Sequence, residues 1–97
     1  RATQKKEYVA KALNYFARIG VAEFLCEAGS LQEGEKILIM GPTTGVIEHR
    51  PDEIRVDLIK VKETHPGERF SISVPRKIRR ADKLYKLITI TQSSDNP

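Results

Sequence analysis

The sequence is poor in cysteine and in long apolar runs, and each shortage excludes a class of protein. Its single cysteine, Cys26, excludes an internal disulfide and a zinc site built from several cysteines. No apolar run approaches the ~18–20 residues that a membrane helix needs, and no basic and then apolar leader opens the sequence. An Asn-x-Ser/Thr glycosylation motif is also lacking. We therefore expect a cytoplasmic protein with no membrane partner.

The length and composition bound the architecture. The 97 residues suffice for one small domain, and 39% hydrophobic with 31% charged residues is typical of soluble globular chains. The first residue is Arg1 rather than Met, so we expect a piece of a longer protein. We divide the sequence into a linker remnant at 1–6, a barrel domain at 7–90 and a disordered tail at 91–97.

The charge is concentrated at the two ends of the chain. Residues 1–20 carry a net charge of +4 and residues 69–97 carry +5, whereas residues 21–68 carry −5. If the first and last strands pair, these ends form one basic face to which Lys5, Lys6, Lys11 and Arg18 belong.

Strand signals dominate the sequence. Phe70, Ile72 and Val74 alternate with serines, and the segments 21–27, 36–40 and 54–57 carry apolar residues at the same period of two. Segments 8–16 and 83–90 are rich in aromatic and β-branched residues. Turn signals with glycine or proline separate these runs at short intervals. This pattern predicts a small all-β barrel or sandwich.

We expect the following residues in the core: Val9, Leu13, Ala22, Phe24, Ile37, Ile39, Ile54, Val56, Phe70, Ile72, Val74, Leu84 and Ile88.

The segment 29–41 (GSLQEGEKILIMG) indicates which type of all-β fold the chain adopts. Its spacing of Gly29, Leu31, Gly34, Ile37 and Ile39 resembles the second domain of elongation factor Tu and related translation factors. That resemblance implies a small closed barrel of six or seven mostly antiparallel strands.

A second resemblance covers most of the chain, from about Tyr8 to Leu87. It rests on segments 14–16 (NYF), 19–24 (IGVAEF), 41–45 (GPTTG), 54–57 (IRVD) and 77–86 (KIRRADKLYK). In this order they resemble the C-terminal barrel domain of the collagenase-like peptidases, family thirty-two of the unassigned-mechanism (U) peptidases. The resemblance implies a larger catalytic domain upstream that carries an iron–sulfur cluster and either cuts protein or takes part in hydroxylating transfer or ribosomal RNA.

The chain itself offers no convincing catalytic or metal site. Segment 41–45 lacks the lysine of a phosphate-binding loop, His49 and His65 lack ligand spacing, and Cys26 shares a strand face with apolar residues. We therefore expect no catalytic residue and no cofactor within these 97 residues.

The most strongly charged stretch of the sequence is the cationic run at residues 76–86. Six of its eleven residues are lysine or arginine, and one is acidic. Such a cluster can neutralise several phosphates, and an aromatic side chain beside it can stack on an unpaired base. Tyr15 and Phe16 are further stacking candidates. The candidate RNA-binding residues are Arg76, Lys77, Arg79, Arg80, Lys83, Tyr85 and Lys86.

Two other functions for this run stay open. The cations could dock on an acidic face of the upstream catalytic domain, or they could be a solvated surface. From a different functional class, an exposed strand edge could add a peptide or collagen-like strand, or the domain could serve for docking or dimerisation. We take RNA positioning for a linked enzyme as the leading hypothesis.

Overall fold

The computed structural model describes residues 2–91, and every regular element in that range is a β-strand. The strands predicted from the period of two are all present, together with β4 and β6, which the sequence pattern did not reveal. In chain order the strands are β1 (Ala2–Phe16), β2 (Val21–Cys26), β3 (Ile37–Gly41), β4 (Gly45–His49), β5 (Ile54–Val56), β6 (Ile59–Val61), β7 (Arg69–Ser73) and β8 (Lys83–Thr91).

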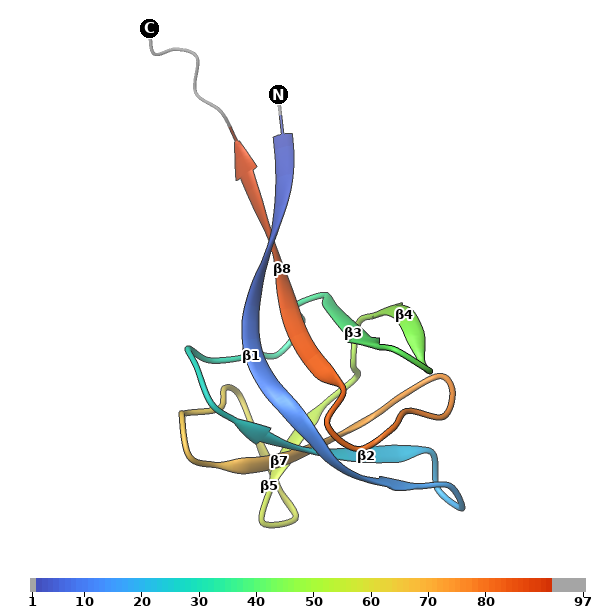
Figure 1. Ribbon diagram of the computed structural model, residues 1–97. Coiled ribbons are helices and arrows are strands. Elements are labelled where there is room, and N and C mark those ends of the chain that lie inside the picture. The colour runs from blue at the N-terminus through green and yellow to red at the C-terminus, as the bar shows by residue number, and fades with distance from the viewer. Residues whose placement is uncertain (1, 92–97) are drawn as a thin grey trace, which may run out of the picture.

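All strands join one antiparallel sheet in the order β4-β3-β8-β1-β2-β7-β5-β6. The first and last strands, β1 and β8, are neighbours in this sheet, as the hypothesis of one basic face requires (Figure 1). The predicted all-β, translation-factor-like architecture is therefore confirmed, and β1 and β8 form its longest strand pair.

The predicted closure of the barrel is not confirmed, because the strand order of residues 2–91 is open at β4 and β6. Side chains occupy the edge of β4 instead of a neighbouring strand. The Arg76 guanidinium donates to the carbonyl oxygens of Thr44 at 2.9 Å and Val46 at 3.1 Å. His49 Nε2 lies 3.0 Å from the carbonyl oxygen of Ser73. Arg76 thus satisfies carbonyls at the free edge of β4, and the His49 contact joins β4 to the end of β7.

The sheet has more strands than the six or seven expected, because β5 and β6 are the arms of a very short hairpin. Asp57 and Leu58 connect them with φ angles of 53° and 67°, the left-handed conformation of a two-residue hairpin turn. The sequence pattern indicated β5 from the alternation at 54–57, but it did not indicate that the chain turns at Asp57 and Leu58 into a second strand.

A single apolar core lies inside the curled sheet. At its centre the rings of Phe24 and Phe70, from neighbouring strands, stack with centroids 5.6 Å apart. A bulge in β1 between Tyr8 and Ala10 turns the consecutive residues Val9 and Ala10 both inward, and both are fully buried. The buried apolar residues are Val9, Ala10, Ala12, Ala22, Phe24, Cys26, Leu31, Ile37, Ile39, Ile47, Ile54, Phe70, Ile72, Val74, Ile78 and Leu84.

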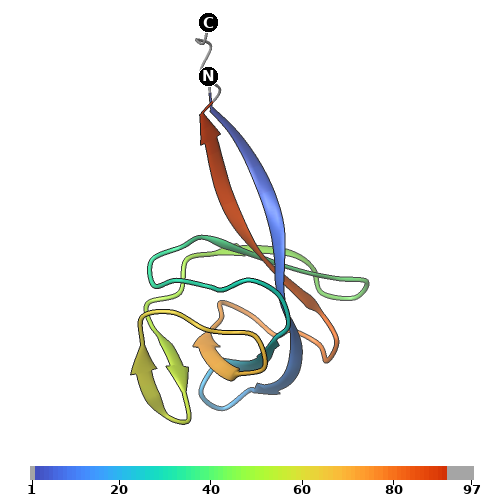
Figure 2. The same cartoon turned by 90° about the vertical axis from the view of Figure 1, so that its left-hand side faces the viewer.

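Three residues expected in the core are only half-buried. Val56 packs against the edge of the core, Leu13 follows directly on a register shift in β1, and Ile88 lies where β8 leaves the rounded body. There β1 and β8 continue as a two-stranded ribbon, which Figure 2 shows projecting from the curled strands. Residues 2–6, expected as a linker, form the start of β1. Of the tail expected at 91–97, Thr91 ends β8 and the rest lies outside the described residues.

Nothing in the described range forms a helix of the length and apolarity required to cross a membrane.

Candidate functional site

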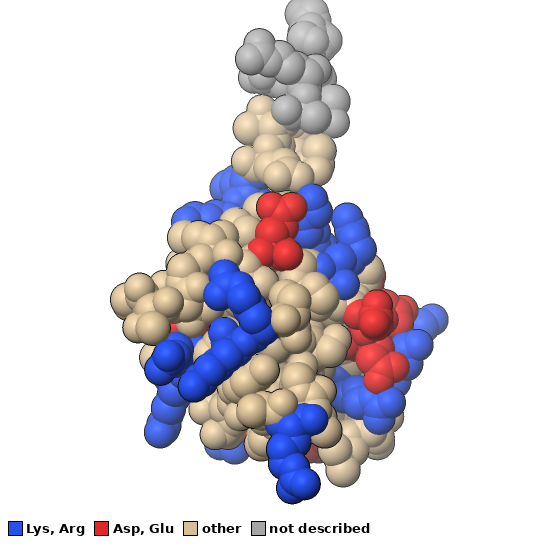
Figure 3. Space-filling model, turned by 90° about the vertical axis from the view of Figure 1, so that its right-hand side faces the viewer, with Lys and Arg blue, Asp and Glu red and all other residues tan. Residues whose placement is uncertain are grey.

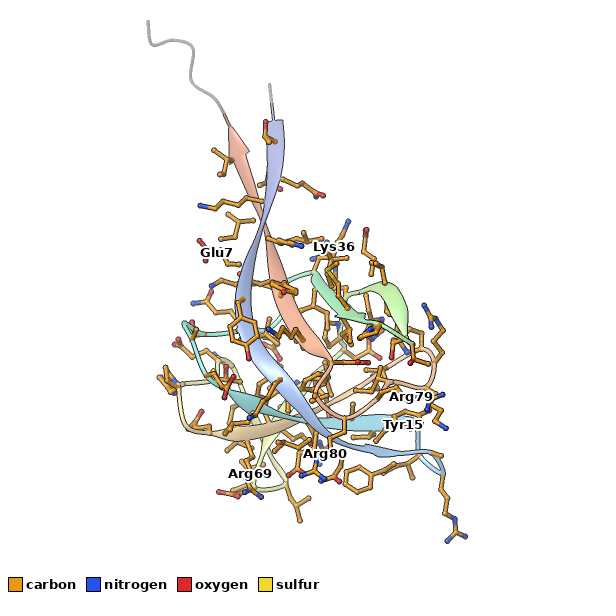
Figure 4. The ribbon with its side chains drawn as sticks, viewed as in Figure 1. Glu7, Tyr15, Lys36, Arg69, Arg79 and Arg80 are labelled. Carbon is orange, nitrogen blue, oxygen red and sulfur yellow. The ribbon has the colours of Figure 1, made fainter. Side chains whose placement is uncertain are left out.

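The structure does not gather the predicted cations into one patch. On the side of the molecule that carries the β3–β4 hairpin, Lys and Arg side chains lie in several separate groups with acidic side chains between them (Figure 3). Arg79 and Arg80 lie at the end of the molecule away from the termini, whereas Lys36 lies beside the β1–β8 pair (Figure 4). The candidate residues must therefore be considered one group at a time.

Two of the predicted cations are held by the protein's own backbone. Arg76 bonds the carbonyls at the edge of β4, as described above. Lys86 shares the inward face of β8 with the core residue Leu84, and its Nζ donates to the carbonyl oxygen of Ser30 at 2.9 Å. Both side chains would have to break these hydrogen bonds to reach a phosphate, so we assign them structural roles.

The loop that carries most of the cations, residues 75–82, is anchored by a buried carboxylate. Asp82 is 2% exposed, and its Oδ2 accepts the hydroxyl of Thr44 and the backbone N–H of Arg79, the latter at 2.9 Å. The backbone of the loop also pairs with β1, because the N–H of Ala12 donates to the carbonyl of Asp82 at 2.7 Å. Asp82, the single acid of the cationic run, therefore holds the loop that carries the cations in place.

Lys77 and Arg79 stand over a shallow depression between this loop and the tip of the β3–β4 hairpin. The depression has a volume of about 240 Å³, and Thr43, Thr44 and Arg76 complete its lining. Within residues 2–91 neither Lys77 nor Arg79 takes part in an ion pair. Two cations without an ion pair, beside the exposed Thr43, form a surface on which a phosphate can be bound.

The loop leads directly into β8, whose outward face pairs aromatic rings with cations. Tyr85 lies opposite Tyr8 of β1, and their rings meet edge to face with centroids 5.8 Å apart. Lys6 Nζ lies 4.8 Å from the Tyr85 ring centroid, and Lys83 Nζ lies 5.8 Å from that of Tyr8. We give one name, the basic face, to this cluster of Lys6, Tyr8, Lys83 and Tyr85 together with Lys77 and Arg79 of the adjoining loop.

Lys83 of the basic face has a cross-strand partner that stability alone does not favour. Lys11 and Lys83 are direct cross-strand partners, and like charges placed opposite each other destabilise a sheet. Lys11 is partly compensated by Glu27, whose Oε2 lies 3.7 Å from the Lys11 Nζ. Among residues 2–91 Lys83 takes part in no ion pair, and its Nζ lies 5.8 Å from the centroid of the Tyr8 ring.

Sequence reasoning correctly grouped Lys6 with the last strand but assigned no role to Tyr8. Only the register of β1 against β8 reveals Tyr8 as the partner of Tyr85. Of the other aromatic candidates, Tyr15 packs against the core and Phe16 lies in a different surface groove. Lys5 precedes Lys6 on the opposite face of β1, and Arg18 lies in the β1–β2 turn.

The hydroxyl of Tyr8 is fixed by Glu27, to which it donates a hydrogen bond. Burial, together with this bond and the carboxylate charge, raises the pKa of Tyr8 from 10.0 to about 12. Because the folded pKa is the higher one, the protonated hydroxyl stabilises the fold below pH 10, and this contribution is lost as the pH rises from 10 towards 12.

We predict that the ionisation of Tyr8 gives an absorbance step centred near pH 12, which is the step that Tyr8→Phe removes. In Glu27→Gln this step is expected to move towards pH 10. The measurement is an absorbance titration of the wild-type chain and both variants. A Tyr8 step that stays in place in Glu27→Gln would show that the carboxylate does not hold this ring.

The remaining chemical groups lie apart from the basic face. Cys26 is 1% exposed, and its Sγ lies 3.5 Å from Thr64 Oγ1 and 3.6 Å from the carbonyl of Gly29. One buried thiol cannot supply the ligand set of an iron–sulfur cluster, so the cluster that the resemblance implies stays a prediction for the upstream domain. Within residues 2–91 no three His, Cys, Asp or Glu side chains gather as a metal site.

Comparisons with known proteins show that the chain is similar to part of two proteins named as a collagenase and a protease. It is 51% identical over 85 residues to a collagenase of Porphyromonas gingivalis strain W83 and 28% identical over 83 residues to an uncharacterized protease of Methanocaldococcus jannaschii. These alignments cover 88% and 86% of the chain but only 20% of each relative. The chain therefore spans about a fifth of the length of these relatives. No family model matches the sequence.

Solved structures confirm the fold. The C-terminal domain of a Geobacillus thermoleovorans protein described as a U32 peptidase superposes with a TM-score of 0.77 at 17% identity, covering 82% of this chain and 91% of that domain. A bacterial selenocysteine-specific elongation factor superposes with a TM-score of 0.58 at 21% identity, covering 84% of this chain and 14% of the factor. Both predicted resemblances, to the collagenase-like peptidase domain and to the translation-factor barrel, are confirmed.

Proposed function

We propose that this domain is a non-catalytic accessory domain that binds RNA on its basic face and positions it for an upstream catalytic domain of the same protein. The similarity to C-terminal domains, together with the small share of each relative that the chain covers, supports the accessory role. A transfer or ribosomal RNA is the proposed substrate, and a cytoplasmic location stays part of the same proposal.

The observation that supports the proposal is that Lys6 and Lys83 lie beside the Tyr8–Tyr85 ring pair, on the outward side of β1 and β8. Proteins that bind unpaired RNA combine aromatic rings, on which bases stack, with cations that follow the phosphates. Lys77 and Arg79 extend the cationic track beyond the Lys83 end of the face. Arginine and lysine contacts to phosphate supply affinity without sequence preference, as an accessory domain requires.

We expect the chain to bind a short oligouridylate and a transfer RNA at low salt, with an affinity that falls steeply as salt is added. The triple variant Lys77→Gln, Arg79→Gln and Lys83→Gln removes three phosphate contacts. Each contact to a single strand contributes about 0.7 to the slope of log affinity against log salt, so the slope is expected to fall by about 2. Fluorescence anisotropy over a salt series measures it.

A matched control separates this surface from net charge. Arg18→Gln, Lys60→Gln and Lys62→Gln lower the net charge by the same amount at positions outside the basic face. This control is expected to retain most of the slope, because exposed charges beyond a Debye length are screened. RNA binding that is absent at low salt, or that both triple variants weaken equally, would refute the proposal.

A further inference from the structure

A groove separate from the basic face crosses the outward side of β2, β7 and β5. Its volume is about 870 Å³. Three of its apolar side chains are exposed to solvent: Phe16 at 46%, Ile19 at 70% and Leu58 at 86%. The groove is lined by Phe16, Ile19, Val21, Glu23, Asp52, Glu53, Arg55, Asp57, Leu58, Arg69, Phe70, Ser71, Ile72 and Ser73.

The shape of the groove follows from the strand register. Ser71 and Ser73 face outward on the central strand β7, and because their side chains are small, the groove is deepest there. Ile19 belongs to the β1–β2 turn and Leu58 to the β5–β6 turn, so large apolar side chains stand at the margins. Because β5 is hydrogen-bonded on both sides, to β6 and β7, an occupant must lie across the sheet face rather than extend its edge.

The rim of the groove carries an excess of carboxylates. Four acidic side chains line it against two arginines, and Arg55 is already engaged by Glu53 in an ion pair. Within residues 2–91 Asp52 and Asp57 take part in no ion pair. An occupant therefore gains most when it presents a large apolar side chain to the groove and positive charge to its rim.

We propose that this groove binds an extended peptide segment of a partner protein in which one or more large apolar residues are flanked by lysine or arginine. The apolar side chain covers Ile19 and Leu58, and the cationic neighbours pair with Asp52 and Asp57. Burial of the apolar contacts supplies the affinity, and the carboxylates select against acidic segments.

No residue that lines the groove belongs to the basic face. The β1–β2 and β5–β6 turns lie at the end of the molecule opposite the tips of β1 and β8 (Figure 1).

The test begins with selection of a phage-displayed library of random linear peptides against the wild-type chain, followed by synthesis of the enriched peptides. We expect enrichment of apolar residues flanked by Lys or Arg. Affinity for the synthetic peptide is expected to fall about tenfold for each apolar contact removed in the double variant Ile19→Ser and Leu58→Ser. Both side chains are exposed, so the fold is expected to tolerate the change.

Two further variants make the test specific. Val46→Ser and Ile59→Ser remove apolar side chains that are 55% and 67% exposed but lie outside the groove, and they are expected to leave the affinity unchanged. Asp52→Asn with Asp57→Asn is expected to weaken binding and to reduce its salt dependence. Asparagine is well tolerated in the left-handed conformation that Asp57 adopts, so this change leaves the turn intact.

Three outcomes would overturn the proposal. The first is selection of acidic peptides or of none, and the second is affinity that survives in the Ile19→Ser and Leu58→Ser variant. The third is concentration-dependent dimerisation of the wild-type chain that this variant abolishes, which would assign the groove to a second copy of the domain.

Discussion

Replacement of Gly41 by alanine is expected to lower the free energy of unfolding by about 3 kcal/mol, although Gly41 lies on a regular strand. A Cβ at this position would lie 1.9 Å from Asp82 Oδ1 and 2.5 Å from its Cγ, far inside van der Waals contact. The carboxylate cannot move aside freely, since it is buried and accepts hydrogen bonds from Thr44 and Arg79. Its displacement would break both bonds and release the loop from the β3–β4 hairpin.

Thermal and urea unfolding of the two chains measures the effect, and a loss of this size corresponds to a fall of roughly 15 °C in Tm for a domain of this length. The control is a double-mutant cycle with Asp82→Ala. That variant is itself destabilised, but it provides the space that the new methyl group needs, so Gly41→Ala is expected to cost little on its background. Additive effects of the two substitutions would contradict the packing of Gly41 against Asp82.

This contact illustrates what the sequence does not reveal. In the sequence, Gly41 directly follows the predicted strand at 36–40, and Asp82 is the one acid in a cationic run. Nothing in the local pattern of either residue indicates that they touch, because the contact joins segments that are far apart in the chain. The register of β3 against β8, which places Met40 opposite Lys83, brings them together.

The strands themselves could be predicted, because a strand with one buried face carries apolar residues at every second position. Phe70 and Ile72 follow that rule and are buried. The rule fails where the chain departs from regular pleating. Ala10 is buried because a bulge precedes it, and Ile78 is buried from a loop that has no period.

The candidate site was predictable in composition but not in arrangement. A count of cations cannot distinguish Lys83, which faces solvent on the outward side of β8, from Lys86, which bonds a backbone carbonyl on the inward side. Arg76 likewise satisfies carbonyls at the edge of β4, a role that exists only because the sheet remains open there. Charge density indicates the kind of ligand, and tertiary contacts decide which charges are free to bind it.

Loss of both rings from the basic face is expected to weaken binding of a short oligouridylate by at least about 30-fold, since each base stacked on an aromatic side chain contributes about 1–3 kcal/mol. The variant is Tyr8→Leu with Tyr85→Leu, which keeps apolar side chains on the strands. The salt slope is expected to stay unchanged, because no cation is removed. Anisotropy titrations at several salt concentrations separate the two quantities.

Two comparisons decide whether the rings act by stacking. Tyr8→Phe with Tyr85→Phe keeps both faces for a base and is expected to retain most of the affinity, even though Tyr8 loses its bond to Glu27. Duplex RNA of the same length offers no unstacked base, so its binding is expected to be insensitive to the leucine variant. Equal binding of oligouridylate by the wild-type and leucine chains would exclude stacking while leaving phosphate binding intact. Because the triple cation variant changes the slope and the leucine variant changes the affinity at constant slope, electrostatic attraction and base stacking can be measured separately on one small sheet.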